Sequence, residues 1–137
     1  MKTNLITLAA LLAAMVWLAL HAYMVEWTPV KIGGAALAVV SVGLMVTARL
    51  QLGGSFSVKA KASTLVTTGL YSKIRNPIYV FGALMLVGMA IVLGNWVLLV
   101  LVVLLTPVQL YRARKEEAVL AEAFGEEYAR YKAGTWF

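Results

Sequence analysis

Four long apolar segments constrain this chain more than any other feature of its sequence. They cover about residues 5–25, 32–50, 77–94 and 96–111. A helix needs about 20 consecutive apolar residues to cross the hydrocarbon core of a bilayer, and the first two segments approach that length. The last two are slightly short for a full span, and local thinning of the bilayer or partial insertion would accommodate them. The sequence therefore predicts an all-α, polytopic membrane protein with about four transmembrane helices.

The composition is also that of a membrane protein rather than of a soluble domain. Charged residues make up 13% of the 137 positions and apolar residues 62%, whereas soluble domains carry about 25% charged residues. A chain of this length forms one domain. We expect residues 1–50 to supply two transmembrane helices. Residues 51–137 would supply a cytosolic loop, a helical hairpin and a cytosolic C-terminal helix.

The first apolar segment has a second interpretation, as a secretory signal peptide. Its apolar stretch is longer than the usual hydrophobic region of a signal peptide, and only Lys2 marks a basic N-terminal region. No small-x-small cleavage site follows it cleanly. We therefore interpret the segment as a transmembrane helix.

The chain is basic, with 12 Lys and Arg against 6 Glu and no Asp. In a soluble protein this balance would suggest nucleic acid, but here the cations lie between and after the apolar segments. Anionic lipid head groups and the positive-inside rule explain that placement, so we expect membrane lipids and no nucleic acid as partners. The cations of the 51–76 loop and of the tail are Lys59, Lys61, Lys73, Arg75, Arg112, Arg114, Lys115, Arg130 and Lys132. Four spans with both termini, this loop and the tail in the cytosol fit these positions.

The chain lacks the residues of several kinds of site. It has no Cys, which excludes disulfides, thiolate metal sites and a cysteine nucleophile. Its single histidine, His21, excludes a histidine-based metal cluster and a Ser-His-Asp triad. We expect no metal in the functional site.

The third and fourth apolar segments are separated only by Asn95, which predicts a tight helical hairpin with Gly94 at its tip. Pro77 is suited to the first position of a helix, and Asn76 to the N-cap before it. Helical spacing continues past the fourth segment until Gly125, and a short helix can restart after it. The start of the third helix must therefore lie beside the end of the fourth.

This hairpin brings two polar clusters to one membrane interface. The free backbone N–H groups in the first turn of the helix that begins at Pro77, together with the guanidinium of Arg75, would form an anion site. A capped helix with an arginine reaching toward head groups is the simpler interpretation. Glu116 and Glu117 would bind hydroxyls or an ammonium group of a polar ligand. Here the simpler interpretation is a solvated helix face, with Arg112 and Glu116 as an i,i+4 pair.

The stretches "LVTTGLYSKIRNPIYVFG" and "RARKEEAVLAEAFGEEYARYK" resemble the isoprenylcysteine carboxyl methyltransferase family and the related phospholipid methyltransferases. Those enzymes have a Gly-x-Tyr turn, Arg-His-Pro-x-Tyr, a Glu-Glu pair after a hairpin, and a Phe-Gly-x-Glu-Tyr-x-x-Tyr tail. The matching positions are Gly69, Tyr71, Arg75, Pro77, Tyr79, Glu116, Glu117, Phe124, Gly125, Glu127, Tyr128 and Tyr131. The resemblance covers about residues 50–132. The chain departs from it at Asn76, where the family often has His, and at Gly82, one position later than the usual glycine.

The resemblance implies an integral membrane methyltransferase that uses S-adenosylmethionine and has its active site facing the cytosol. It assigns Arg75, Tyr79 and Glu117 to catalysis. The residues that it assigns to the cofactor pocket are Asn76, Pro77, Tyr79, Gly82, Glu116 and Glu117. The acceptor would be a lipophilic small molecule or lipidated substrate, most like a prenylcysteine-type carboxylate. A phospholipid or another lipid amine is the alternative, and an amine would need to lose a proton.

Two other classes fit the apolar segments less well. A small four-span transporter usually needs an ionisable residue deep in a span, and these segments carry none there. A membrane scaffold without catalysis belongs with the transporter to this non-enzyme alternative. A sterol-type membrane reductase shares related motifs but usually has a much longer chain. Gln109, at the polar end of the fourth segment, either packs between helices or lines the pocket.

Overall fold

The computed structural model describes residues 22–53 and 65–136, together with residues 9, 12, 13, 16, 17, 19 and 20. All regular structure in these residues is helical, which confirms the all-α prediction for this part of the chain. The elements are the 3-10 turn η1 (Ala22–Met24), α2 (Pro29–Leu52), the 3-10 turn η3 (Gly69–Ser72), α3 (Pro77–Leu93), α4 (Trp96–Phe124) and α5 (Glu126–Ala133).

The first predicted span, residues 5–25, lies largely outside the described residues. The seven described positions between residues 9 and 20 have helical backbone. His21, Lys59 and Lys61 lie outside the described residues.

Two of the described helices, α2 and α4, are long and apolar enough to cross a membrane. The third apolar helix, α3, has 17 residues and is shorter than a typical span. Only the first part of α4 is apolar, because charged residues begin at Arg112. Two candidate spans are therefore found among the described helices, and four transmembrane helices stay a prediction.

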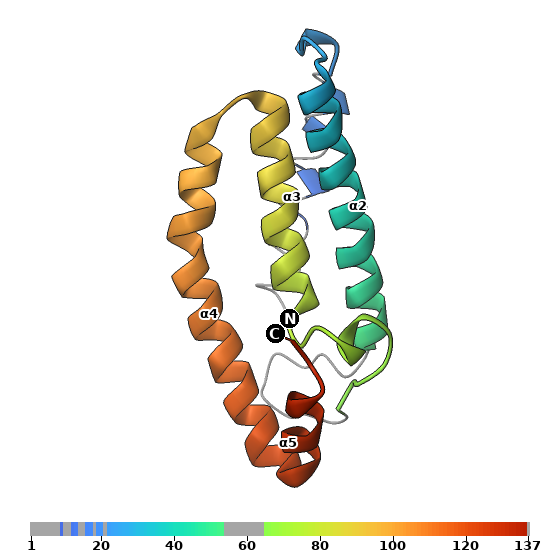
Figure 1. Ribbon diagram of the computed structural model, residues 1–137, viewed down its shortest axis with the longest axis vertical. Helices are drawn as coiled ribbons and strands as arrows, with labels where there is room; N and C mark the ends of the chain where they lie inside the picture. The colour runs from blue at the N-terminus through green and yellow to red at the C-terminus, as the bar shows by residue number, and fades with distance from the viewer. Residues whose placement is uncertain are drawn as a thin grey trace.

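Helices α2 and α3 lie side by side in opposite directions (Figure 1). Their backbones approach closely where Gly34 faces Gly88: a Cβ added to Gly88 would lie 2.6 Å from the Gly34 carbonyl oxygen. Small residues allow such an approach between helices in a membrane. Ala38, Met85 and Val92 fill the interface beside this crossing and are completely buried.

The hairpin between α3 and α4 is confirmed. Gly94 ends α3 with φ 60° and ψ 26°, the left-handed conformation that glycine adopts at no steric cost. Asn95 is the N-cap of α4, and its side-chain oxygen accepts a hydrogen bond of 3.0 Å from the Val97 backbone N–H. From this tip α4 runs back along α3, diverging from it toward the far end (Figure 1).

Helix α4 continues through 29 residues and ends at Gly125, as the spacing predicts. Gly125 has φ 51° and ψ −120°, a conformation that is essentially restricted to glycine. The chain turns sharply there, and α5 runs back toward the start of α3 (Figure 1). This turn places the tail of the chain beside the loop that precedes α3.

Candidate functional site

The site begins where the η3 loop enters α3. Pro77 is the first residue of α3 and Asn76 occupies the N-cap, as predicted. The predicted side-chain cap is wrong, because the Asn76 side chain makes no capping hydrogen bond. Its ψ is 57°, whereas Thr28, which does cap α2, has an extended ψ of 159°. The Asn76 carbonyl instead accepts hydrogen bonds from the N–H groups of Tyr79 and Val80.

Arg75 and Glu117 form the central ion pair of the site. The Arg75 Nε lies 3.1 Å from Glu117 Oε1, and the two side chains are 17% and 18% exposed. The second carboxylate oxygen, Oε2, accepts a hydrogen bond of 3.0 Å from the Lys132 ammonium. Burial alone would raise the pKa of Glu117, but the hydrogen bonds from Lys132 and Arg75 outweigh it and the pKa is lowered. Glu117 is therefore an anion held between two cations.

Arg75 also ties the tail to the loop before α3. Its Nη1 donates to Thr135 Oγ1 at 2.9 Å and to the Lys132 carbonyl at 3.4 Å. The Trp136 backbone N–H donates to the Lys73 carbonyl at 2.8 Å. These contacts, with those of Glu117, connect the loop, α4 and the tail around one guanidinium.

Two tyrosines support the same junction. The Tyr131 hydroxyl of α5 donates to the Tyr71 carbonyl of η3 at 2.7 Å. Tyr71 is itself buried, with 7% of its surface exposed, and burial raises the pKa of its hydroxyl. The η3 turn is thus held against α5 by a partly buried hydrogen bond.

Glu116 binds the start of α3. The Tyr79 hydroxyl donates a hydrogen bond of 2.6 Å to Glu116 Oε1. Glu116 is exposed over the residue as a whole, yet the protein around its carboxyl group raises its pKa, against the lowering effects of the Tyr79 hydrogen bond and of Arg112. The two adjacent glutamates therefore differ in their surroundings: one pairs with cations and the other with a hydroxyl.

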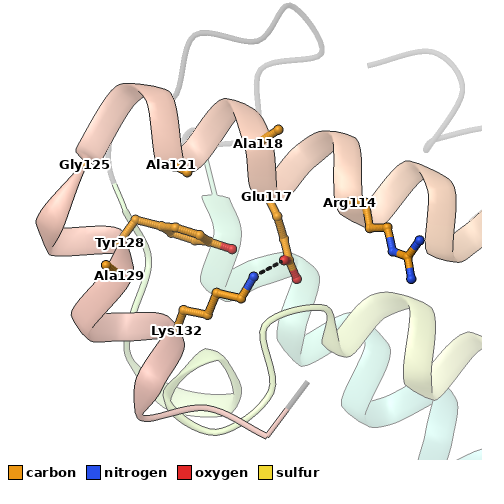
Figure 2. Close-up of a pocket in the computed structure, with 8 residues that line it drawn as sticks. All are labelled: Arg114, Glu117, Ala118, Ala121, Gly125, Tyr128, Ala129 and Lys132. Atoms are coloured by element: carbon orange, nitrogen blue, oxygen red, sulfur yellow. Dashed lines mark hydrogen bonds and ion pairs between the residues drawn. The ribbon is translucent and has the colours of Figure 1, made fainter.

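Glu117 also borders a pocket of about 440 Å³ between α4 and α5 (Figure 2). The lining residues are Arg114, Glu117, Ala118, Ala121, Gly125, Tyr128, Ala129 and Lys132. Tyr128 is 3% exposed, and its hydroxyl is buried without a hydrogen-bond partner in the described part of the chain. Burial raises the pKa of Tyr128 to about 12, so the hydroxyl keeps its proton at neutral pH.

The structure brings together four of the predicted site residues in two pairs, Arg75 with Glu117 and Tyr79 with Glu116. Gly82 is placed differently, since a Cβ on it would approach Met45 of α2 at 4.0 Å. Gln109 is half-buried, and its Oε1 is buried without a partner among the described residues. That oxygen is compatible with either interpretation of Gln109.

Sequence reasoning missed Lys132 as a partner of Glu117 and the pocket between α4 and α5. A signal for the pocket exists in the sequence. Small residues recur at helical spacing on both sides of the turn, at Ala118, Ala121, Gly125 and Ala129. Larger side chains at these positions would fill the space between α4 and α5 that forms the pocket.

Comparison with known proteins gives one family match. The family model described as phospholipid methyltransferase matches residues 29–127. The matched region is more than two thirds of the chain and contains α2, α3, α4 and the four residues of the two pairs, Arg75–Glu117 and Tyr79–Glu116. No curated protein and no solved structure gives a significant match.

Proposed function

Because this chain belongs to the phospholipid methyltransferase family of membrane methyltransferases, we propose that it transfers a methyl group from S-adenosylmethionine to a lipophilic acceptor. Members of the family typically use S-adenosylmethionine. The observation that carries the proposal is the pair of glutamates at the junction of α3, α4 and α5, one of which holds an ammonium group at 3.0 Å.

The residues at this junction fit the methyl donor. When bound, S-adenosylmethionine supplies a methyl group on a sulfonium, and it also carries an ammonium, a carboxylate and ribose hydroxyls. The contact of the Lys132 ammonium with Glu117 supports a role for this carboxylate in binding the ammonium of the donor. We propose that Glu116 and Glu117 hold the polar groups of the donor, and that the start of α3 lines its pocket through Asn76, Pro77 and Tyr79.

The protein's task in this reaction is alignment and exclusion of water. Arg75 is anchored by Glu117 and Thr135, so its guanidinium has a defined position from which to orient an anionic acceptor. A prenylcysteine-type carboxylate is such an acceptor and needs no base. We place Arg75, Tyr79 and Glu117 in the catalytic group on these grounds.

A lipid amine, as in a phospholipid head group, is the second candidate acceptor. The specific observation in its favour is Glu116 at this junction, whose pKa is raised by desolvation in spite of the hydrogen bond of 2.6 Å from the Tyr79 hydroxyl. A carboxylate with a raised pKa is better matched to removing a proton from an amine than an ordinary glutamate. Either acceptor would reach the site from the bilayer, while the donor would enter from the cytosol.

We further propose that the chain is an integral membrane protein with four spans, its termini and site facing the cytosol. The basic residues of the tail and of the loop before α3 support this orientation. In the apolar parts of α2, α3 and α4, charged residues are confined to the helix ends. That distribution favours an enzyme at the interface over a transporter with a buried ion site.

The decisive test is binding. Calorimetry on the purified protein in lipid nanodiscs should show S-adenosylmethionine and its demethylated product binding to wild type, and Arg75→Ala and Glu117→Ala should each weaken this binding at least tenfold. Glu122→Ala is the matched control, since Glu122 is an exposed glutamate on the same helix. Wild-type protein that is folded and binds neither molecule would rule the proposal out.

The acceptor class is resolved by a second measurement. Transfer of labelled methyl should be followed with a panel of prenylcysteines, phospholipids with primary amines, and small lipophilic acids. Activity on carboxylates alone supports the first candidate, and activity on amines alone supports the second. If the donor binds and no lipophilic acceptor is methylated, the proposed reaction is wrong although the donor site is right.

A further inference from the structure

The hydroxyl of Tyr128 has no partner although it is deeply buried. Only 3% of the residue is exposed, and its oxygen makes no hydrogen bond to any of the described residues. Buried polar groups in native proteins are nearly always hydrogen-bonded, so this hydroxyl calls for an explanation. Figure 2 shows it pointing from α5 toward Glu117, at one side of the pocket.

The nearest carboxylate is already engaged. Both oxygens of Glu117 carry a cation, Arg75 on Oε1 and Lys132 on Oε2. The Tyr128 hydroxyl therefore lies beside a carboxylate that is already bound to two cations. A tyrosine hydroxyl can donate one hydrogen bond and accept others, and an anionic group is a partner for the bond that it donates.

The charges around the pocket favour an anionic acceptor. Two cations, Arg114 and Lys132, line it together with one anion, Glu117. The remaining lining residues besides Tyr128 are three alanines and a glycine, which offer no polar side chain. The pocket thus combines more positive than negative side chains, a buried hydroxyl without a partner among the described residues, and a carboxylate that binds an ammonium.

A carboxylate and an ammonium on neighbouring atoms are the end of an α-amino acid. We propose that the pocket between α4 and α5 binds the amino-acid end of S-adenosylmethionine. The Tyr128 hydroxyl donates to its carboxylate, Arg114 adds positive charge, and Glu117 takes its ammonium in place of Lys132. This inference rests on the proposed function and adds to it the residues that recognise the donor's carboxylate.

The test compares two donors that differ only in that group. Dissociation constants for S-adenosylmethionine and for decarboxylated S-adenosylmethionine should be measured by calorimetry with wild type and Tyr128→Phe. A hydrogen bond to a charged group corresponds to a change of roughly tenfold or more in affinity. We expect Tyr128→Phe to bind S-adenosylmethionine about tenfold more weakly and the decarboxylated donor as wild type does.

Tyr131→Phe is the matched control. It removes a hydroxyl from the same short helix, but that hydroxyl binds the Tyr71 carbonyl and does not line the pocket. Any loss that Tyr131→Phe causes should affect the two donors equally. If Tyr128→Phe likewise affects both donors equally, or affects neither, the inference is overturned.

Two further outcomes separate this inference from the proposed function. If folded wild type binds neither donor, both fail together. If wild type binds both donors with the same affinity, the donor site stands and the carboxylate subsite does not. Should Tyr128→Phe prove unfolded in a thermal scan, Arg114→Gln replaces it, because Arg114 is exposed. Arg114→Gln must then weaken the binding of S-adenosylmethionine more than the binding of the decarboxylated donor. If it weakens the binding of both donors equally, the inference is overturned.

Discussion

At the scale of single residues, Glu116 and Glu117 show how strongly surroundings decide the chemistry of a carboxyl group. Glu117 accepts hydrogen bonds from Arg75 and Lys132, and its pKa is lowered. Glu116 accepts one from Tyr79, and desolvation raises its pKa. The two side chains are consecutive on one helix, so their difference comes from the partners that α3 and α5 present.

The opposite shifts predict opposite pH dependences of stability. Glu117 binds protons more weakly in the folded state than in the unfolded state. Its contribution to the stability of the fold is therefore complete above its unfolded pKa near 4.5 and is lost as the pH falls below that value. Glu116 binds protons more tightly when folded, so its ionisation reduces stability as the pH rises above 4.5.

We therefore expect Glu117→Gln to lower the free energy of unfolding by about 1–3 kcal/mol at pH 7 and by less at pH 4. Glu116→Gln, which keeps an acceptor for Tyr79, should not destabilise at pH 7 and should reduce any fall in stability between pH 5 and pH 7. Unfolding by denaturing detergent at several pH values measures both. If the free energy of unfolding changes with pH in the same way in both variants, the two glutamates do not have the different surroundings described above.

Residue by residue, the sequence predicted more of the site's members than of their contacts. Arg75, Tyr79 and the two glutamates follow from the hairpin and from the family's motif. Lys132 and Tyr128 could not be placed, because their partners depend on the direction in which α5 leaves Gly125. The Asn76 cap failed because side-chain capping needs an extended ψ, which residue type alone does not reveal.

At the scale of elements, the turn at Gly125 determines where α5 and the tail lie. Its φ of 51° with a ψ of −120° excludes a residue with a Cβ unless the backbone moves. Everything after it, including Lys132 on Glu117 and Thr135 on Arg75, depends on that single conformation. The sequence indicated a helix break at this position but not its direction.

We expect Gly125→Ala to cost about 1–3 kcal/mol of stability through backbone strain. It should also weaken donor binding, because α5 can no longer present Lys132 and Tyr128 to Glu117. Gly134→Ala is the control, since Gly134 has an ordinary helical φ of −91° and a Cβ there would make only normal contacts. Thermal unfolding and calorimetry of both variants check the prediction. Wild-type donor affinity in folded Gly125→Ala would show that the turn does not position the site.

The α2–α3 interface gives a second element-scale prediction. A Cβ on Gly88 would collide with the Gly34 carbonyl, so Gly88→Ala should separate the two helices and lower the unfolding temperature. Gly33→Ala, one residue before Gly34, meets nothing within 4 Å and should be neutral or stabilising by up to about 1 kcal/mol. Equal effects of the two substitutions would mean that the close approach does not hold the pair together.

At the scale of the whole molecule, the structure has an apolar end at the α3–α4 hairpin and a polar end that contains the site. The sequence predicted this polarity from the positions of the cations and the length of α4. It could not decide how many helices cross the bilayer, because α3 is shorter than a typical span and length alone does not distinguish partial insertion.

The absence of cysteine makes the orientation directly measurable. Asn95→Cys at the hairpin tip and Glu122→Cys near the end of α4 each provide a single thiol. In sealed vesicles, a membrane-impermeant maleimide should label Glu122→Cys from the cytosolic side and Asn95→Cys from the opposite side. Labelling of both thiols from one side would show that the hairpin does not span the bilayer.

The long sequence separation of the site's contacts has a consequence for how the protein is made. Arg75 meets Glu117 across 42 residues and Thr135 across 60, whereas each helix forms through bonds between near neighbours. Contacts of high sequence separation cost loop entropy and form after local ones. A preparation can therefore contain all its helices and still lack a closed site. For this protein, helix content measured by circular dichroism is not a sufficient standard for a competent sample.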